Sequence, residues 1–280
     1  MGLTCGTRHT ESMPELPEVE TIVRGLRPSV TGERIRTAEF QWARTCVGDP
    51  DYVCGELSGQ VVTGIRRWGK YLVFDLEKAG AASVMVVHLR MTGNLLLSAE
   101  PGPWTRATFV FSSGKSLIFN DIRKFGRIEW ARDLPTRLLE LGPEPLEVGI
   151  DEFVARLRRR SAQVKAVMLN QEFVRGLGNI YCDEALFRAG IHPRASTARL
   201  GRTRATRLHA AIQEVLIEAI EQGGSTIANF VNSEGAQGYF QLRTAVYGKT
   251  GEACKVCSRP IRKIIVASRS THYCSRCQRR

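Results

Sequence analysis

The sequence has no long apolar run. No stretch approaches the roughly 18 consecutive apolar residues that a membrane-spanning helix needs. The first twelve residues, MGLTCGTRHTES, lack the apolar core of a secretory signal peptide. We find no internal repeat and no low-complexity segment, which excludes repeat architectures. These absences predict a cytosolic protein with no membrane-spanning helix.

Acidic residues are scarce relative to basic ones. The 280 residues include 40 Lys and Arg against 28 Asp and Glu, for a formal net charge of +12. Such an excess favours a polyanionic partner. Nucleic acid is the first candidate and an anionic membrane surface is the second. The membrane is the weaker candidate because no amphipathic basic helix dominates the sequence, so we expect no membrane partner. The length suggests about two domains.

Four of the eight cysteines form a cluster with metal-ligand spacing. Cys254-x2-Cys257 and Cys274-x2-Cys277 are separated by sixteen residues. Two such pairs present four thiolates to one tetrahedral ion and leave no open coordination position, so we predict one structural zinc. The residues between the pairs are basic, with a β-prone centre at 264–266. They form either a hairpin that contacts the duplex backbone or enters a groove, or only a solvated basic face.

The chain divides into a β-rich and a helical part. Residues 57–132 contain short β-like runs punctuated by turns, which indicates a sandwich or barrel. Two prolines within 141–146 cannot continue a helix or strand, so the linker is expected there. Apolar residues then recur at helical spacing. The strands are expected at 60–66, 71–77, 83–91, 107–111, 116–120 and 127–130, and the helices around 153–168 and 208–220.

The run Met13-Pro14-Glu15-Leu16-Pro17-Glu18-Val19-Glu20 allows two interpretations. If the methionine is trimmed, Pro14 presents a free secondary amine that can attack an electrophilic carbon, and Glu15 is close enough to move protons. Alternatively the prolines and glutamates only open a helix, because apolar residues follow Leu16 at helical spacing.

Six segments in one order resemble the formamidopyrimidine-DNA glycosylase family. The resemblance covers Pro14 to Cys277. Any one piece is weak, but six in the right order are specific. The segments are Pro14–Glu20, Gly69–Leu72, His88–Gly93, Asp121–Gly126, Gly176–Tyr181 and the cysteine module.

The resemblance implies an α+β multidomain fold. Its parts would be an N-terminal β-sandwich with flanking helices at 14–142, a helix–two-turn–helix domain at 143–248, and a β-hairpin zinc finger at 249–280. It further implies a monomeric, cytoplasmic, nucleoid-associated bacterial enzyme. The substrate would be double-stranded DNA that contains an oxidised purine or an abasic site. The enzyme would excise 8-oxoguanine and formamidopyrimidines and then cleave the strand by β,δ-elimination.

The resemblance also assigns roles to residues. Pro14 would be the nucleophile, Glu15 the proton carrier, and Glu18 a residue that orders the site. Lys70, Asn179 and Arg269 would hold phosphates, and Arg269 suits a planar, bidentate grip. Met91, Arg123 and Phe125 would fill the void left by the flipped base, although a single apolar residue is usually core packing. A lesion-capping loop would include Gly235, Gly238 and Tyr239.

One departure from the family pattern affects the chemistry. Pro14 is internal in this sequence, and an amide nitrogen there cannot act as a nucleophile. Either translation starts at Met13, or residues 1–13 are retained and the protein is a precursor or a non-catalytic lesion binder. We expect the first. An endonuclease VIII-type enzyme for oxidised pyrimidines and an RNA-binding zinc protein are further alternatives.

Overall fold

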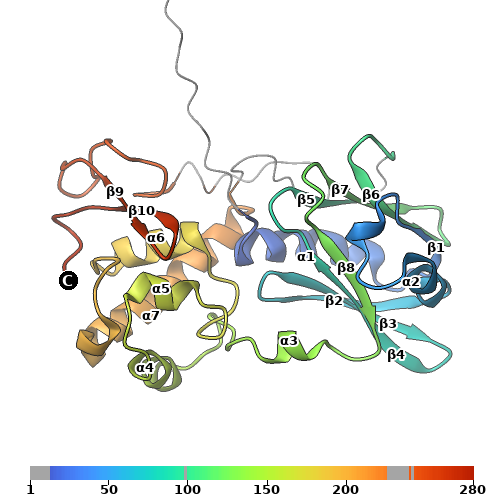
Figure 1. The fold of residues 1–280 in the computed structure, drawn as a ribbon, viewed down its shortest axis with the longest axis horizontal. Helices are drawn as coiled ribbons and strands as arrows, with labels where there is room; N and C mark the ends of the chain where they lie inside the picture. Colours follow the sequence, from blue (N-terminus) through green and yellow to red (C-terminus); the bar gives the residue numbers. More distant parts are fainter. Residues whose placement is uncertain (1–12, 98–99, 226–239, 241–242) are drawn as a thin grey trace, which may run out of the picture.

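The computed structural model describes residues 13–97, 100–225, 240 and 243–280. A β-rich half and a helical half lie at opposite ends of the long axis, with the N-terminal helix between them (Figure 1). Among the described helices, none is both long and apolar enough to cross a membrane. The fold class predicted from the sequence is confirmed.

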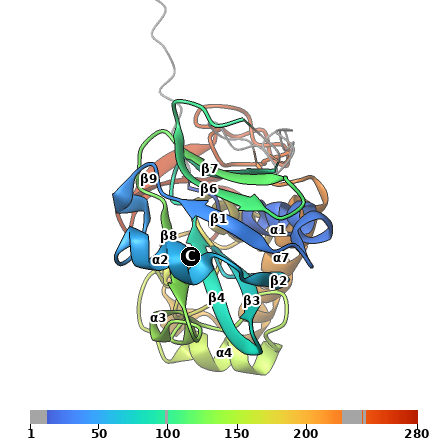
Figure 2. The ribbon, with the colours of Figure 1, turned by 90° about the vertical axis from the view of Figure 1, so that its right-hand side faces the viewer.

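Two four-stranded antiparallel sheets form the β-rich half. One has the order β2-β3-β4-β8 and the other β1-β6-β7-β5. When the β-rich half faces the viewer, the two sheets lie one above the other (Figure 2). The strands are β1 (Ile35–Glu39), β2 (Val61–Trp68), β3 (Tyr71–Lys78), β4 (Ala81–His88), β5 (Gly93–Leu97), β6 (Thr105–Phe111), β7 (Ser116–Asp121) and β8 (Arg127–Ala131).

The apolar faces of both sheets meet in one core. Phe74, Phe109 and Phe119 are fully buried there. The short helices η1 (Ala43–Thr45) and α2 (Pro50–Leu57) flank this core. The expected strand at 83–91 ends earlier, at His88, so Met91 lies in a loop instead of the sheet. Strands β1 and β5 were not expected from the sequence.

Helix α1 (Leu16–Val30) belongs to both halves of the molecule. Its first residue, Leu16, is buried in the core of the helical half. Val19, Ile22 and Val23 are buried in the sandwich core. The backbone N–H of Glu15 donates to Glu18 Oε2 at 2.8 Å, which satisfies one of the donors that a helix start leaves unpaired. The helix therefore fixes the two halves relative to each other.

Ion pairs tie the linker to the sandwich. Segment 141–146 has no helix or strand, as predicted. Arg67 grips Glu144 through two nitrogens at 2.9 and 2.8 Å and also pairs with Glu20 on α1. Both Arg67 and Glu144 are largely buried, so this bidentate pair is geometrically specific. The linker is thus held against the β-rich half.

The helical half contains a helix–two-turn–helix unit. The turns at 170–178 join α5 (Val164–Leu169) to α6 (Asn179–Arg188). Apolar residues of α5, α6 and α7 pack into one core, which confirms the helical periodicity. The other helices are α3 (Thr136–Leu139), α4 (Ile150–Arg158), η2 (Thr197–Arg199) and α7 (Arg202–Glu221).

The C-terminal module is a β-hairpin beside two cysteine turns. Strands β9 (Arg262–Val266) and β10 (Arg269–Tyr273) pair in antiparallel register. Val246 and Ile261 pack with Cys254 and Cys274 in a small core, against Phe187 of α6. The hairpin therefore rests on the second helix of the helix–two-turn–helix unit.

Candidate active site

A cavity of about 490 Å³ lies between the β-rich and helical halves. The β-rich side contributes Met13, Glu15, Lys70 and Met91, and the helical side contributes Asn179 and Arg269. Five residues that the sequence singled out therefore line one space: Glu15, Lys70, Met91, Asn179 and Arg269. Pro14 is buried, and its two neighbours in the sequence, Met13 and Glu15, line the cavity. The roles of all these residues stay predictions.

The Glu15 side chain lies against the N-terminus of α6. The Ile180 N–H donates to Glu15 Oε1 at 2.9 Å. A Cβ on Gly178 would lie 2.3 Å from the Glu15 carboxyl carbon, so only glycine leaves room for this side chain. The second oxygen, Oε2, is buried and has no hydrogen-bond partner among the described residues. One carboxylate oxygen is therefore fixed, and the other is available to a ligand.

Burial shifts the acidity of Glu15. Burial raises the pKa of Glu15 from 4.5 to about 7, although the Lys70 charge opposes this shift and the Glu18 charge adds to it. A carboxyl with a pKa near the working pH can both take and give a proton. Glu15 can therefore exchange protons with a group bound in the cavity.

Glu18 forms a second buried carboxyl site behind Glu15. Its Oε1 accepts from the Tyr181 hydroxyl at 2.5 Å and from the Ser225 N–H at 2.7 Å. Burial raises the pKa of Glu18, and the Tyr181 bond opposes that shift. Glu18 thus connects α1 to α6 and to Ser225, four residues beyond the end of α7.

Positive charge surrounds the mouth of the cavity. Lys70 is half-buried and Arg269 is exposed. Burial, together with the positive charges of Arg90 and Lys70, lowers the pKa of His88 to about 3, so this imidazole is neutral at physiological pH. Cationic donors on both sides of the cavity suit a ligand with anionic groups.

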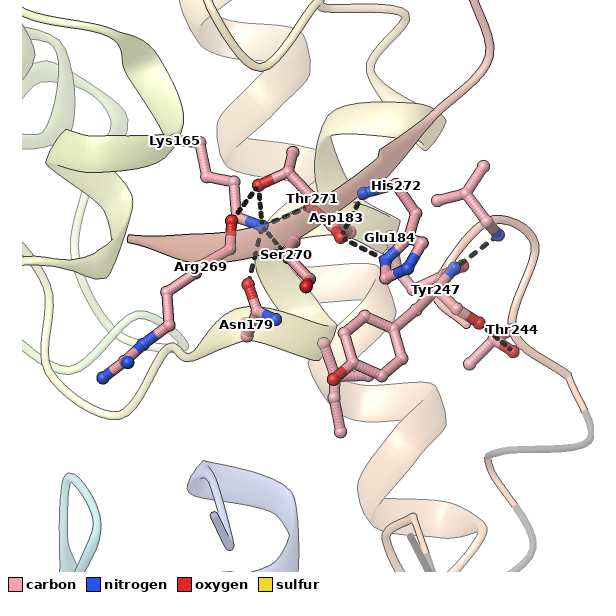
Figure 3. A network of polar contacts seen from close by, with 12 residues as sticks. Lys165, Asn179, Asp183, Glu184, Thr244, Tyr247, Arg269, Ser270, Thr271 and His272 are labelled. Atoms are coloured by element: carbon pink, nitrogen blue, oxygen red, sulfur yellow. Dashed lines mark hydrogen bonds and ion pairs between the residues drawn. The ribbon is translucent and has the colours of Figure 1, made fainter. Parts of the chain in front are cut away.

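A buried lysine connects Asn179 to the zinc-module hairpin (Figure 3). Lys165 Nζ donates to Asn179 Oδ1 and Asp183 Oδ1, both at 2.6 Å, and to Thr271 Oγ1 at 2.8 Å. Asp183 also accepts from the His272 backbone at 2.8 Å. The oxygen of Asn179 is therefore occupied, which directs its amide N–H groups elsewhere. Sequence reasoning did not predict this network.

The void-filling candidates lie on two loops. Met91 is half-buried, whereas Arg123 is exposed and Phe125 is 47% exposed. The Arg123 guanidinium lies 5.0 Å from the centre of the Phe125 ring. Phe125 is thus not a core residue, and the alternative of ordinary core packing is wrong for it.

The four clustered cysteines have the geometry of a metal site. Their sulfur atoms all lie within 4.8 Å of one another. The pairs Cys254–Cys277 and Cys257–Cys274 are 3.8 and 3.4 Å apart. Tetrahedral zinc with Zn–S bonds of about 2.3 Å places its sulfurs about 3.8 Å apart. The residues fit one structural zinc, as predicted.

Sequence reasoning missed one further buried acid. Glu184 accepts backbone N–H groups of Ala245, Val246 and Tyr247 at 2.7–3.0 Å. It thereby fixes the segment that leads into the zinc module. Only its place in α6, beside Asp183, could have drawn attention to it. Gly235, Gly238 and Tyr239, predicted for the capping loop, lie outside the described residues.

Three family models together match most of the chain. They are the formamidopyrimidine-DNA glycosylase N-terminal domain (residues 13–128), the formamidopyrimidine-DNA glycosylase H2TH domain (141–231) and the zinc finger found in FPG and IleRS (251–280). The formamidopyrimidine-DNA glycosylase of Solibacter usitatus is 50% identical, covering 96% of this chain and 100% of the relative. That of Bacillus licheniformis is 42% identical, with coverage of 96% and 100%.

Solved structures have the same fold. The MutM (FPG) protein of Thermus thermophilus superposes with a TM-score of 0.86 at 41% identity, covering 95% of this chain and 98% of that one. Lactococcus lactis Fpg in complex with abasic-site DNA gives a TM-score of 0.85 at 37% identity, and MutM with carbocyclic 8-oxo-G DNA gives 0.87 at 38%. These two cover 95% of this chain and 100% of theirs.

A sandwich, a helix–two-turn–helix unit and a zinc hairpin around one cationic cavity define a DNA-repair glycosylase. The chain belongs to the formamidopyrimidine-DNA glycosylase family.

Proposed function

We propose that this protein excises oxidised purines, chiefly 8-oxoguanine and formamidopyrimidines, from duplex DNA and then cleaves the strand. Family membership and the DNA ligands named for the similar structures support this substrate class. The observation that carries the proposal is the cavity itself. It unites the acid next to Pro14 with cationic and amide donors from both halves of the chain.

The first step in this proposal is base removal at a flipped nucleotide. A damaged base inside a duplex is unreachable, so it must leave the stack. The Pro14 amine, once free, attacks the sugar C1′, and the base leaves with the bonding electrons. Glu15 carries protons at the sugar, and its pKa of about 7 supports this role.

The second step is strand cleavage. The Pro14 nitrogen lone pair then opens the C1′–O4′ bond of the sugar, and O4′ takes up a proton. The resulting cationic iminium between Pro14 and the sugar acidifies the C2′ proton. Loss of that proton expels the 3′ phosphate by β-elimination, and a δ-elimination follows. Lys70, Asn179 and Arg269 hold the phosphates around the lesion, and their positions around one cavity support this role.

Three side chains fill the space that the flipped base leaves. Met91 and Phe125 are apolar wedges, and Arg123 satisfies the orphaned partner base. The exposure of Phe125 and the half-burial of Met91 support an intermolecular role for these residues. Gly235, Gly238 and Tyr239 cap the lesion.

The zinc supplies no chemistry at the sugar. Its ligands are Cys254, Cys257, Cys274 and Cys277, and by binding it they fix the hairpin that carries Arg269.

The active enzyme begins at Pro14 in this proposal. The family model begins at residue 13, and the full lengths of the relatives align with 95–96% of this chain. The domains extend over 14–142, 143–248 and 249–280, and the protein acts as a monomer. Duplex DNA is its substrate, so the proposed place of action is the nucleoid in a bacterial cytoplasm.

The test uses two forms of the protein. One starts at Pro14 and the other keeps residues 1–13, so the Pro14 nitrogen is a free amine only in the first form. Borohydride should trap a covalent adduct with 8-oxoguanine duplex only for the first form. No adduct from either form would leave a non-catalytic lesion binder. Faster excision of thymine glycol than of 8-oxoguanine would establish the endonuclease VIII-type specificity instead.

A further inference from the structure

One buried carboxylate lies beneath both void-filling loops. Asp121 is the last residue of β7 and is fully buried. Its backbone is fixed on both sides, because its N–H donates to the Trp104 carbonyl and its carbonyl accepts from Arg106 Nε, each at 2.9 Å. The carboxylate is therefore held in one place by the sheet.

The carboxylate accepts hydrogen bonds from two loops that are far apart in the sequence. The Thr92 hydroxyl, next to Met91, donates to Oδ1. The Arg123 N–H donates to the same oxygen at 3.1 Å and also to Thr92 Oγ1 at 3.1 Å. The Gly126 N–H donates to Oδ2 at 2.7 Å. Asp121 and Thr92 thus join the Met91 loop to the loop of Arg123 and Phe125.

Apolar packing joins the same two loops a second time. The Phe119 ring, two residues before Asp121 on β7, lies between two glycines. A Cβ on Gly93 would approach this ring to 2.8 Å, and a Cβ on Gly126 to 2.3 Å. Both loops therefore close on the same ring, and only glycine permits that approach.

Backbone conformation in both loops is unusual in the same way. Arg90 has φ of 57° and Lys124 has φ of 61°, in the left-handed region that side chains disfavour. Such residues persist where the surrounding contacts determine the conformation. The two loops are therefore shaped in advance instead of being ordered when DNA arrives.

We propose that Asp121 is a positioning residue that couples the two loops into one preformed wedge for base extrusion. This inference rests on the proposed function of Met91, Arg123 and Phe125. Three side chains from two loops can enter one gap between bases only if their spacing is already correct. A wedge formed in advance avoids the ordering cost on binding.

The test changes the bridging hydroxyl and leaves the buried acid in place. Thr92→Val keeps the shape and removes the hydrogen bond, and Thr92→Ser keeps the bond. Each protein is assayed on duplex DNA with 8-oxoguanine opposite cytosine, which requires extrusion. Each is also assayed on single-stranded DNA with an abasic site, which has no stacked base to extrude. Because both assays use the same preparation, their ratio is insensitive to partial unfolding.

We expect Thr92→Val to lower the single-turnover excision rate on duplex roughly ten- to hundredfold, with single-strand cleavage unchanged. Thr92→Ser should match the parent protein. Asp121→Asn should act in the same direction, because an amide has one acceptor oxygen and cannot accept from both loops. An equal loss on both substrates, or no loss on duplex, would overturn the inference. A parent protein inactive on both substrates would instead contradict the proposed function.

Discussion

The two sides of the cavity position their functional groups by opposite means. On the β-rich side, the buried Asp121 carboxylate accepts mainly backbone N–H groups of the loops. On the helical side, the buried Lys165 ammonium donates mainly to side-chain oxygens of Asn179, Asp183 and Thr271. The first arrangement requires one acid, one hydroxyl and two glycines. The second requires four side chains spread over 106 positions, and its hairpin also depends on a metal.

Removing zinc tests this comparison most strongly. A structural zinc contributes about 10–16 kcal/mol to the folding of zinc-finger peptides. Chelation should therefore unfold the hairpin and abolish tight duplex binding, measured by fluorescence anisotropy. All four tryptophans lie between positions 42 and 130, in the β-rich half. Their emission should stay unchanged; a red shift would show that the packing of the β-rich half also depends on the zinc module.

Breaking the lysine network should have the next largest effect. Lys165→Met leaves the fully buried Asp183 carboxylate without its cation, and such changes cost about 3–5 kcal/mol. Urea unfolding followed by circular dichroism measures the loss. The double variant Lys165→Met/Asp183→Leu should recover much of it, because no charge is left unpaired. Lys263→Met, on the exposed face of the hairpin, is the matched control.

Glu15 lies where the two sides meet, and its titration should appear in the stability of the protein. Burial raises its pKa to about 7, so the folded state binds a proton that the unfolded state has released above pH 4.5. This contribution is fully present below about pH 4.5 and is lost as the pH rises through about 7. Relative to the parent, Glu15→Gln should gain on the order of 3 kcal/mol between pH 4.5 and 8.

Denaturant unfolding of both proteins across that pH range provides the measurement. Glu147→Gln changes an exposed glutamate and should follow the parent at every pH. Parallel pH profiles for the parent and Glu15→Gln would show that Glu15 titrates normally in the folded state.

The smallest predicted effect concerns the glycine beside the Phe119 ring. Gly126→Ala places a methyl group 2.3 Å from that ring and should cost about 1–3 kcal/mol. Unfolding monitored by tryptophan emission reports this loss. Gly102→Ala, where a Cβ meets nothing within 4 Å, is the control and should be neutral. If both variants unfold alike, the loop closes on Phe119 less tightly than the distances indicate.

Local patterns predicted much of the fold and of the cavity. Cysteine spacing, the helical period after Leu16 and the motif segments each depend on neighbours in the sequence. Strand β1 was not predicted because Ile35 is its only buried residue, so its sequence shows no alternation of apolar and polar residues. Helix α2 was also not predicted, although Asp49 as its N-cap and Pro50 as its first residue are a recognised sequence signal for a helix start.

The buried polar groups could not be predicted in this way. Lys165 resembles any lysine on an amphipathic helix, and its partners lie up to 106 positions away. Asp121 was recognised only as the start of a loop motif. The hydrogen bonds that give both residues their place depend on tertiary structure, which residue types and spacing do not encode.

Helix α1 has a consequence for how this protein could be divided. Leu16 completes the core of the helical half, whereas the following turns complete the core of the sandwich. Dividing the chain within the linker at 141–146 would leave the C-terminal fragment without that first turn. The apolar surface against which Leu16 packs would then be exposed to solvent. The two fragments would therefore be complementary pieces, each carrying part of the other's interior, instead of modules that can be exchanged between proteins.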